Sequence, residues 1–285
     1  MKVIYDFGAN RGANLCYYLK KADLVVAVEA NLDLCTQLRH RFESFILNKS
    51  LCVEHALLSG TVNASVPFFI HSVHDHLSQL DRPAPDELDL FVETRLATVK
   101  PSSIIEKYGS PYYVKIDLEN SDSIVSRSIL VDGITPDFIS VEAHSSDIFS
   151  ILRCLGGYNA FKIVAGEDVY RGKYGNISIV EKQGSTSCFS FPRTSAGPFG
   201  DDDIPGPWID TDSFARLLGI HGFGWIDIHA SFSSVVGKPL RLDELSLMKF
   251  AAKAIKSYAI RRTNEFCLHP LAASRKLSAR FSGNF

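Results

Sequence analysis

The segment from Asp6 to Gly12, Asp-Phe-Gly-Ala-Asn-Arg-Gly, has the residue types and spacing of a ligand-binding turn. It follows a β-rich run and directly precedes a run of helical composition. A glycine lets the backbone approach a ligand closely, because a Cβ atom would collide there. Gly8 and Gly12 are spaced G-x-x-x-G, whereas the turn that wraps a dinucleotide pyrophosphate has the spacing G-x-G-x-x-G. We therefore predict that the turn, with Asp6, Gly8, Asn10 and Gly12, binds a cofactor without a phosphate to cradle.

Glu29 is a second candidate, at the end of the apolar run 24–28 and two residues before Asn31. One helix and one strand separate it from Gly12, as a βαβ unit requires. A carboxylate in this place can accept hydrogen bonds from both hydroxyls of a ribose, and Asn31 could face the adenosine. The alternative is a solvated acid at a strand end. We predict Glu29 and Asn31 as cofactor-binding residues.

Two further polar pairs follow apolar runs. Asp117 and Glu119 come after the run 112–116, and Glu142 and His144 end the run 137–141. Each pair shares one side of an extended chain. One carboxylate of the first pair could hold the ammonium or sulfonium end of a cofactor, and the other could bind substrate or act as a base. A histidine titrates near neutral pH and suits proton removal from a hydroxyl, although a polar strand end with a satisfied histidine is the alternative.

The predicted site is thus a set of strand-end residues. The predicted cofactor-binding residues are Asp6, Gly8, Asn10, Gly12, Glu29, Asn31, Asp117 and Glu119, and the predicted catalytic residues are His144 and Asp117. The carboxylates and His144 could in principle bind Mg²⁺ or Mn²⁺, but nothing in their spacing demands it, so we predict no metal. The six cysteines form no CxxC pair and no zinc-like cluster, which is typical of buried thiols in a reducing cytosol.

Alternating strand-like and helix-like runs must position these residues. The β-α-β-α-β order predicts an α/β protein with a mostly parallel sheet and right-handed crossovers. Strands are expected at 2–7, 24–28, 51–58, 112–116 and 137–141, and helices at 14–21, 32–45, 101–108, 121–130 and 146–155. The runs 160–164 and 176–180 are expected to close one edge of the sheet as an antiparallel hairpin.

The composition changes after residue 182, so we predict a binding domain at 1–182 and a C-terminal extension at 183–285. The stretch 183–208 is rich in Gly, Pro, Ser and Asp. We expect its second half, 195–208, to form a lid or substrate loop over the carboxyl edge of the sheet, with Phe199 and Trp208 as its apolar surface. A connection without ligand contact is the alternative. Helices are expected at 211–218 and 240–260.

Bulk properties exclude several classes of protein. The chain has 285 residues, 46% of them hydrophobic, which is enough for a sizeable core. Its formal net charge is −2, so there is no basic excess to neutralise nucleic acid. No apolar run approaches the roughly 18 residues of a membrane span, and the N-terminus lacks a signal-peptide pattern. These features predict a soluble, cytoplasmic protein.

At these residues the chain resembles FkbM-type S-adenosylmethionine-dependent methyltransferases. The resemblance spans about residues 3–164 and is carried by four segments, at 6–12, 28–31 (Val-Glu-Ala-Asn), 114–120 (Val-Lys-Ile-Asp-Leu-Glu-Asn) and 139–142 (Ile-Ser-Val-Glu). It implies a Rossmann-like class I methyltransferase sheet of seven strands with an antiparallel last pair. It also implies S-adenosylmethionine as the methyl donor and a small-molecule acceptor, often a hydroxyl on a sugar or another secondary metabolite. A catalytically silent binding protein with this fold and an NAD-dependent oxidoreductase are the alternatives, and the glycine spacing disfavours the second.

Overall fold

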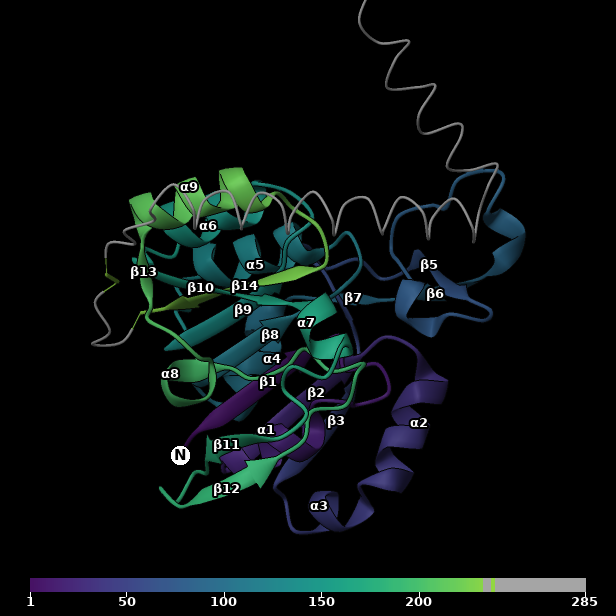
Figure 1. Ribbon diagram of the computed structural model, residues 1–285. Coiled ribbons are helices and arrows are strands. Elements are labelled where there is room, and N and C mark those ends of the chain that lie inside the picture. Colours follow the sequence, from purple (N-terminus) through teal and green to yellow (C-terminus); the bar gives the residue numbers. More distant parts are fainter. Residues whose placement is uncertain (233–236, 239–285) are drawn as a thin grey trace, which may run out of the picture.

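The structure, a computed structural model, describes residues 1–232 and 237–238. Its centre is an eight-stranded sheet. The strands are β1 (Val3–Phe7), β2 (Leu24–Glu29), β3 (Leu51–His55), β8 (Pro111–Ile116), β9 (Phe138–Glu142), β10 (Ala160–Ala165), β13 (Ile209–Asp210) and β14 (Ile226–Ser231). They are arranged in the order β13-β10-β14-β9-β8-β1-β2-β3. The fold is therefore the mostly parallel, Rossmann-like α/β fold that the sequence predicts (Figure 1).

Five strands form the parallel part of the sheet. β1 pairs with β2 and β8, β2 pairs with β3, and β8 pairs with β9, all in parallel. Every residue of β1 and β9 is buried. Parallel strands covered on both faces read as continuous apolar runs, which is why these strands could be predicted from the sequence. Their carboxyl ends lie at one edge, and the predicted site residues follow those ends.

The predicted hairpin of 160–164 with 176–180 is wrong. β14 lies between β9 and β10 and is antiparallel to both. The other predicted partner, β11 (Ile177–Val180), pairs with β12 (Thr186–Phe189) in a separate two-stranded sheet. In β14 the polar residues Asp227 and His229 alternate with apolar ones, so the segment shows no continuous apolar run. Because β13 and β14 both come after residue 182, the predicted domain boundary falls before strands that belong to the central sheet.

Helices cover one face of the sheet. They are α4 (Pro101–Tyr108), α5 (Asp122–Val131), α6 (Asp147–Cys154) and α9 (Thr211–His221). Their apolar side chains share one buried cluster with alternate residues of the central strands, including Phe7 and Val141. Figure 1 shows α5, α6 and α9 on this side and α1 (Leu15–Lys21) on the other. The second face carries α1, α2 (Leu32–Arg41) and the segment 174–208, which includes α8 (Gly200–Asp203).

The segment 174–208 packs as core on this second face. Phe199 is 1% exposed and stacks on Tyr113 of β8 with ring centroids 3.8 Å apart. Trp208 is also buried, with its ring next to Phe138. This differs from the prediction that Phe199 and Trp208 form the surface of a lid. Gly- and Pro-rich composition indicates a chain without regular structure, but it does not say whether the aromatic residues of that chain face solvent or a core.

The chain between β3 and β8 leaves the central sheet and forms an excursion. It holds β4 (Leu57–Leu58), β5 (Val66–His71), β6 (Phe91–Leu96), β7 (Thr98–Val99) and two short 3₁₀ helices, η1 (Asp75–Leu77) and η2 (Leu88–Leu90). β5 and β6 pair antiparallel. The excursion is tied to the site through Arg11, whose guanidinium lies 2.7 Å from Asp75, and through Asn120, which donates to Gln79 at 3.2 Å.

Two small helices, α3 (Glu43–Leu47) and α7 (Gly166–Tyr170), follow α2 and β10. Within the part of the chain that the structure describes, no helix is both long enough and apolar enough to cross a bilayer. The helix predicted at 240–260 lies outside the described residues.

Candidate functional site

The two glycines of the 6–12 turn are required by packing within the protein. Gly8 has φ +84°, and a Cβ there would lie 1.8 Å from the carbonyl oxygen of Asp117. Gly12 has φ +67°, and a Cβ there would lie 2.6 Å from Leu38 of α2. The sequence analysis attributed both glycines to close approach of a ligand. The structure instead shows that they let the turn pack between the end of β8 and α2.

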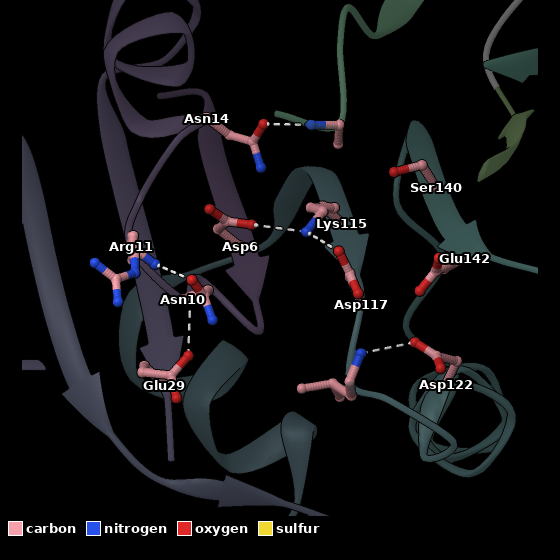
Figure 2. A network of polar contacts seen from close by, with 12 residues as sticks. Asp6, Asn10, Arg11, Asn14, Glu29, Lys115, Asp117, Asp122, Ser140 and Glu142 are labelled. Atoms are coloured by element: carbon pink, nitrogen blue, oxygen red, sulfur yellow. Dashed lines mark hydrogen bonds and ion pairs between the residues drawn. The ribbon is translucent and has the colours of Figure 1, made fainter. Parts of the chain in front are cut away.

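Glu29 is held in place by the backbone on both sides of it. Its Oε2 accepts the N–H of Asn10 at 2.8 Å, and its Oε1 accepts the N–H of Asn31 at 2.8 Å. Burial raises the pKa of Glu29, and these two hydrogen bonds oppose that effect. A carboxylate oxygen has two lone pairs, so each oxygen can accept a second donor. Figure 2 shows Glu29 below Asn10, at the end of its strand.

A pocket opens at the carboxyl ends of β1, β2 and β8. Its empty volume, including the part open to solvent, is about 650 Å³. Five of the predicted cofactor-binding residues line it, namely Gly8, Asn10, Glu29, Asp117 and Glu119. The excursion supplies its other side, and the residues there include Phe68, Asp75, His76, Ser78 and Leu80, none of which could be singled out from the sequence. Nothing in the local sequence of the excursion indicated this return to the strand ends.

Carboxyl groups dominate the polar lining of the pocket, and two of them have ion-pair partners outside the lining: Asp75 pairs with Arg11, and Asp117 pairs with Lys115. Four carboxylates line it, from Glu29, Asp75, Asp117 and Glu119, and among the described residues that line it none is a lysine or an arginine. A pyrophosphate needs positive charge or a cradle of backbone N–H groups. Carboxylates instead suit hydroxyl groups and cationic groups. The lining therefore fits the ribose diol, the ammonium and the sulfonium of S-adenosylmethionine, while the carboxylate of that molecule would have to face backbone N–H groups or solvent.

Three predicted cofactor-binding residues do not line this pocket. Gly12 packs against α2, as described above. Asn31 begins α2, where its Oδ1 accepts the N–H of Asp33 at 3.0 Å. Asp6 is fully buried behind the turn, and neither of its carboxylate oxygens has a hydrogen-bond partner among the described residues. Asn31 and Gly12 thus affect the site indirectly, because they determine how α2 begins and how the 6–12 turn packs against it.

Asp6 forms part of a buried charged group. Lys115 is 3% exposed, and its Nζ lies 2.8 Å from Asp117 and 3.9 Å from Asp6 (Figure 2). Burial raises the pKa of Asp6 to about 7, although Lys115 opposes this. The pKa of Lys115 is raised by the carboxylates of Asp117 and Asp6 in spite of its burial. Lys115, which the sequence analysis did not select, therefore stays charged and holds Asp117 toward the site.

Asp117 also contacts the next strand. It is hydrogen bonded to Glu142, whose carboxylate lies 3.3 Å from Nε2 of His144. Burial opposes ionisation of Asp117, but Lys115 lowers its pKa below the usual range. The hydrogen bond to Glu142 raises the pKa of His144 to about 9. The two predicted catalytic residues are thus brought together through Glu142, with His144 mainly protonated at neutral pH.

More acidic groups surround this pair. Burial and the neighbouring carboxylates raise the pKa of Glu119 to about 8 and that of Asp122 to about 7. Asp227 of β14 lies opposite Glu142 in the sheet, and its pKa is also raised by burial and by Asp117. The sequence analysis missed Asp227, because the place of β14 in the sheet could not be predicted.

The carboxylates could also approach a cation. Oxygen atoms of Asp117, Glu119 and Glu142 lie within 4.8 Å of one another. That spacing is compatible with a divalent ion, but the same groups can share protons, because Asp117 is hydrogen bonded to Glu142 and the pKa values of Glu119 and Glu142 are raised by burial and by the neighbouring carboxylates. The expectation that the site needs no metal stays a prediction.

The structure is similar to several solved proteins at low sequence identity. One is a methyltransferase FkbM from Methylobacillus flagellatus, with 15% identity, a TM-score of 0.39 and coverage of 57% of this chain and 40% of that chain. Another is a precorrin-6Y methyltransferase from Geobacter metallireducens, with 10% identity, a TM-score of 0.32 and coverage of 66% and 75%. A third is an uncharacterised protein from Listeria monocytogenes, with 9% identity, a TM-score of 0.38 and coverage of 98% and 87%.

These likenesses concern the fold, and the chain spans less than half of the FkbM structure that it matches. No protein-family model matches the sequence, and no curated protein matches it. What the chain does must therefore be argued from its own strand ends.

Proposed function

We propose that the protein is an S-adenosylmethionine-dependent methyltransferase that methylates a hydroxyl on a sugar or another secondary metabolite. The observation that carries the proposal is the pocket at the ends of β1, β2 and β8, which is lined by four carboxylates and by no described lysine or arginine. A ligand with a diol and two cationic groups matches that lining, whereas a dinucleotide with its pyrophosphate does not. The NAD-dependent alternative is disfavoured for the same reason.

Each part of the pocket has a role in this proposal. Glu29 would accept hydrogen bonds from the ribose hydroxyls with the lone pairs left over from Asn10 and Asn31. Asp117 and Glu119 would face the ammonium and sulfonium end. The apolar residues of the lining, among them Phe68 and Leu80, would pack on the adenine. When bound, S-adenosylmethionine supplies a methyl group made electrophilic by the positive sulfur.

The protein's own task is to align an acceptor hydroxyl and to remove its proton. Asp117 is ionised and lies where the pocket meets the Glu142–His144 pair, so it would orient the hydroxyl. His144 would take the proton on Nδ1, because its Nε2 faces Glu142. With a pKa of about 9, only roughly one His144 in a hundred is unprotonated at pH 7. Turnover should therefore rise with pH.

The first test compares ligands in a thermal-shift titration with S-adenosylmethionine, S-adenosylhomocysteine and NAD. A ligand at a hundred times its Kd stabilises the native state by about 2.7 kcal/mol. We expect both adenosyl compounds to raise the Tm and NAD to leave it unchanged. A shift with NAD alone would overturn the proposal.

A second test separates an enzyme from a catalytically silent binding protein. Methyl-labelled S-adenosylmethionine is incubated with the protein and a panel of glycosides, and label in the acceptor is measured by mass spectrometry. Label in a glycoside that is absent with heat-inactivated protein supports methyl transfer. Binding of the adenosyl compounds without transfer to any hydroxyl compound supports the silent alternative.

A further inference from the structure

Trp225 lies next to the proposed catalytic residues although it is far from them in the sequence. In the antiparallel pairing of β14 with β9, Asp227 is opposite Glu142, and the N–H of Ala143 donates to the carbonyl of Ile226 at 2.8 Å. Continuing this register by one residue places Trp225 opposite His144. On its other side, the carbonyl of Trp225 accepts the N–H of Gly166 at 2.9 Å. Trp225 therefore stands at the same sheet edge as the strand-end carboxylates.

Alternation along the strands places these side chains on one face as well. In β14, Ile226 and Ile228 belong to the core of the helix-covered face, so Asp227 and Trp225 point to the opposite face. In β9, Ile139 and Val141 belong to that same core, so Glu142 points to the opposite face too. The electrostatic effect of Asp117 and Glu142 on the pKa of Asp227 agrees with this arrangement.

The ring of Trp225 occupies space that a specific glycine leaves open. A Cβ on Gly166 would lie 2.3 Å from the indole ring, so the ring lies directly over the start of α7. Tyr170, at the end of α7, has its ring centroid 6.3 Å from that of Trp225. Trp225 is 42% exposed and Tyr170 is 52% exposed. Two large aromatic rings thus lie at the surface, where they pack against each other and against the start of α7, and are not buried in the hydrophobic core.

We propose that Trp225 and Tyr170, here called the aromatic rim, bind the methyl acceptor. The inference rests on the proposed function and adds the residues that select the acceptor. An aromatic face stacks on the apolar face of a ring, while the carboxylates beyond His144 accept hydrogen bonds from hydroxyls at that ring's edge. The ligand class that matches both features is a hydroxyl-bearing ring with one apolar face. Asp117 lines the pocket, and the aromatic rim begins at Trp225, which the register of β14 with β9 places opposite His144.

Fluorescence can test the rim directly, because the chain has two tryptophans and the other, Trp208, is 6% exposed. In a Trp208→Phe variant saturated with S-adenosylhomocysteine, Trp225 is the reporter. A panel of phenyl and methyl glycosides serves as the probe, and acrylamide quenching is measured. We expect at least one glycoside to protect Trp225 from the quencher. If S-adenosylhomocysteine binds and no glycoside protects Trp225, the inference is overturned while the proposed function stands.

Kinetics provide the second test. Trp225→Ala and Tyr170→Ala are expected to raise the KM for the best glycoside roughly tenfold, the loss expected for one ring-stacking contact, with the Kd for S-adenosylmethionine unchanged. Phe232→Ala is the matched control, since Phe232 follows the opposite end of β14 and is 54% exposed. Equal KM values in all variants would overturn the inference. Failure of the parent protein to bind S-adenosylmethionine would instead overturn the proposed function.

Discussion

At the scale of single residues, the site depends on carboxylates that both accept backbone hydrogen bonds and face the pocket. Glu29 illustrates this, because each of its oxygens receives a backbone N–H from a different turn. The same group that shapes the turn after β1 and the start of α2 faces the pocket. A change at Glu29 should therefore affect ligand binding and local order together.

Replacing Glu29 by glutamine should weaken binding of S-adenosylmethionine roughly ten- to a hundredfold. Hydrogen bonds to a charged group contribute about 1.5–3 kcal/mol, and the amide would also place an N–H toward Asn10 or Asn31. The Kd is measured by titration calorimetry. Glu93→Gln on the exposed side of β6 is the control and should bind as the parent does. An unchanged Kd for Glu29→Gln would remove Glu29 from the cofactor site.

Replacing Glu142 by glutamine should move the pH dependence of turnover. The hydrogen bond to Glu142 is the main cause of the raised pKa of His144, so the variant should return that pKa from about 9 toward 6.5. The rising limb of the plot of kcat/KM against pH then shifts to lower pH by the same number of pH units. Asp147→Asn, an exposed change on the adjoining helix, should leave the limb in place. A limb that persists in His144→Asn would show that another group takes the proton.

The residues that could be predicted are those whose place follows from strand ends alone. Glu29, Asp117 and Glu119 were found because each comes directly after an apolar run, and all three line the pocket. The state of His144 could not be predicted, because it depends on the position of the Glu142 side chain. Asp227 depends on which strands β14 joins, and local sequence does not specify that.

At the scale of elements, the turn after β1 is the tightest junction described. Its path is determined by Gly8, which combines a positive φ with a backbone oxygen of β8 where a Cβ would stand. The pocket wall therefore depends on contact between two neighbouring strand ends, and a side chain at this position would push them apart.

Gly8→Ala should destabilise the fold by roughly 3 kcal/mol or more, because it adds a collision to an unfavourable backbone conformation. Gly184→Ala is a matched control: Gly184 has φ +82° but nothing within 4 Å of the added Cβ. The control should lose only about 1–2 kcal/mol from the backbone conformation. Both losses are measured by denaturant unfolding. Equal losses would mean that the contact with Asp117 relaxes at little cost.

The elements that were predicted correctly carry strong periodic or continuous apolar patterns. The five parallel strands and the helices α4, α5 and α6 belong to this group. The errors concern pairing: the pattern at 176–180 indicated a strand, and the structure has one there as β11, but its partner is β12 instead of β10. A strand pattern reports burial and alternation, whereas the partner is decided by the packing of the whole chain.

At the scale of the whole molecule, the site concentrates carboxyl groups that resist ionisation. The pKa values of Asp6 and Asp122 are raised to about 7 and that of Glu119 to about 8, against about 4 in an unfolded chain. Between about pH 4 and these raised pKa values, the native state holds protons that the unfolded state has released. The free energy of unfolding therefore falls as the pH rises through this range. The raised pKa of His144 likewise lowers the free energy of unfolding as the pH rises from 6.5 to about 9.

The free energy of unfolding should therefore fall steadily from about pH 5 to pH 9. Denaturant unfolding at several pH values measures it. Asp6→Asn should flatten the profile between about pH 4 and 7, because the buried group no longer titrates. A stability that increases between pH 5 and 9 would contradict the assigned directions. Saturation with S-adenosylmethionine should reduce the slope, since its positive groups favour the ionised carboxylates.

The position of β14 also bears on how the protein is made. The residues that line the pocket at the ends of β1, β2 and β8 all occur by Ser121, whereas β14, which pairs with β9, ends only at Ser231. Chains are synthesised from the N-terminus at about 5–20 residues per second, so roughly 5–20 seconds separate the emergence of the two halves of the site. During that interval β9 has β8 beside it but lacks β14, its neighbour on the other side, and Glu142 lacks the residue opposite it. A nascent chain paused before residue 225 would contain every residue that lines the pocket and neither Trp225 nor Asp227. Ribosome-bound chains of increasing length therefore offer a way to observe binding of the proposed cofactor before the proposed acceptor site exists.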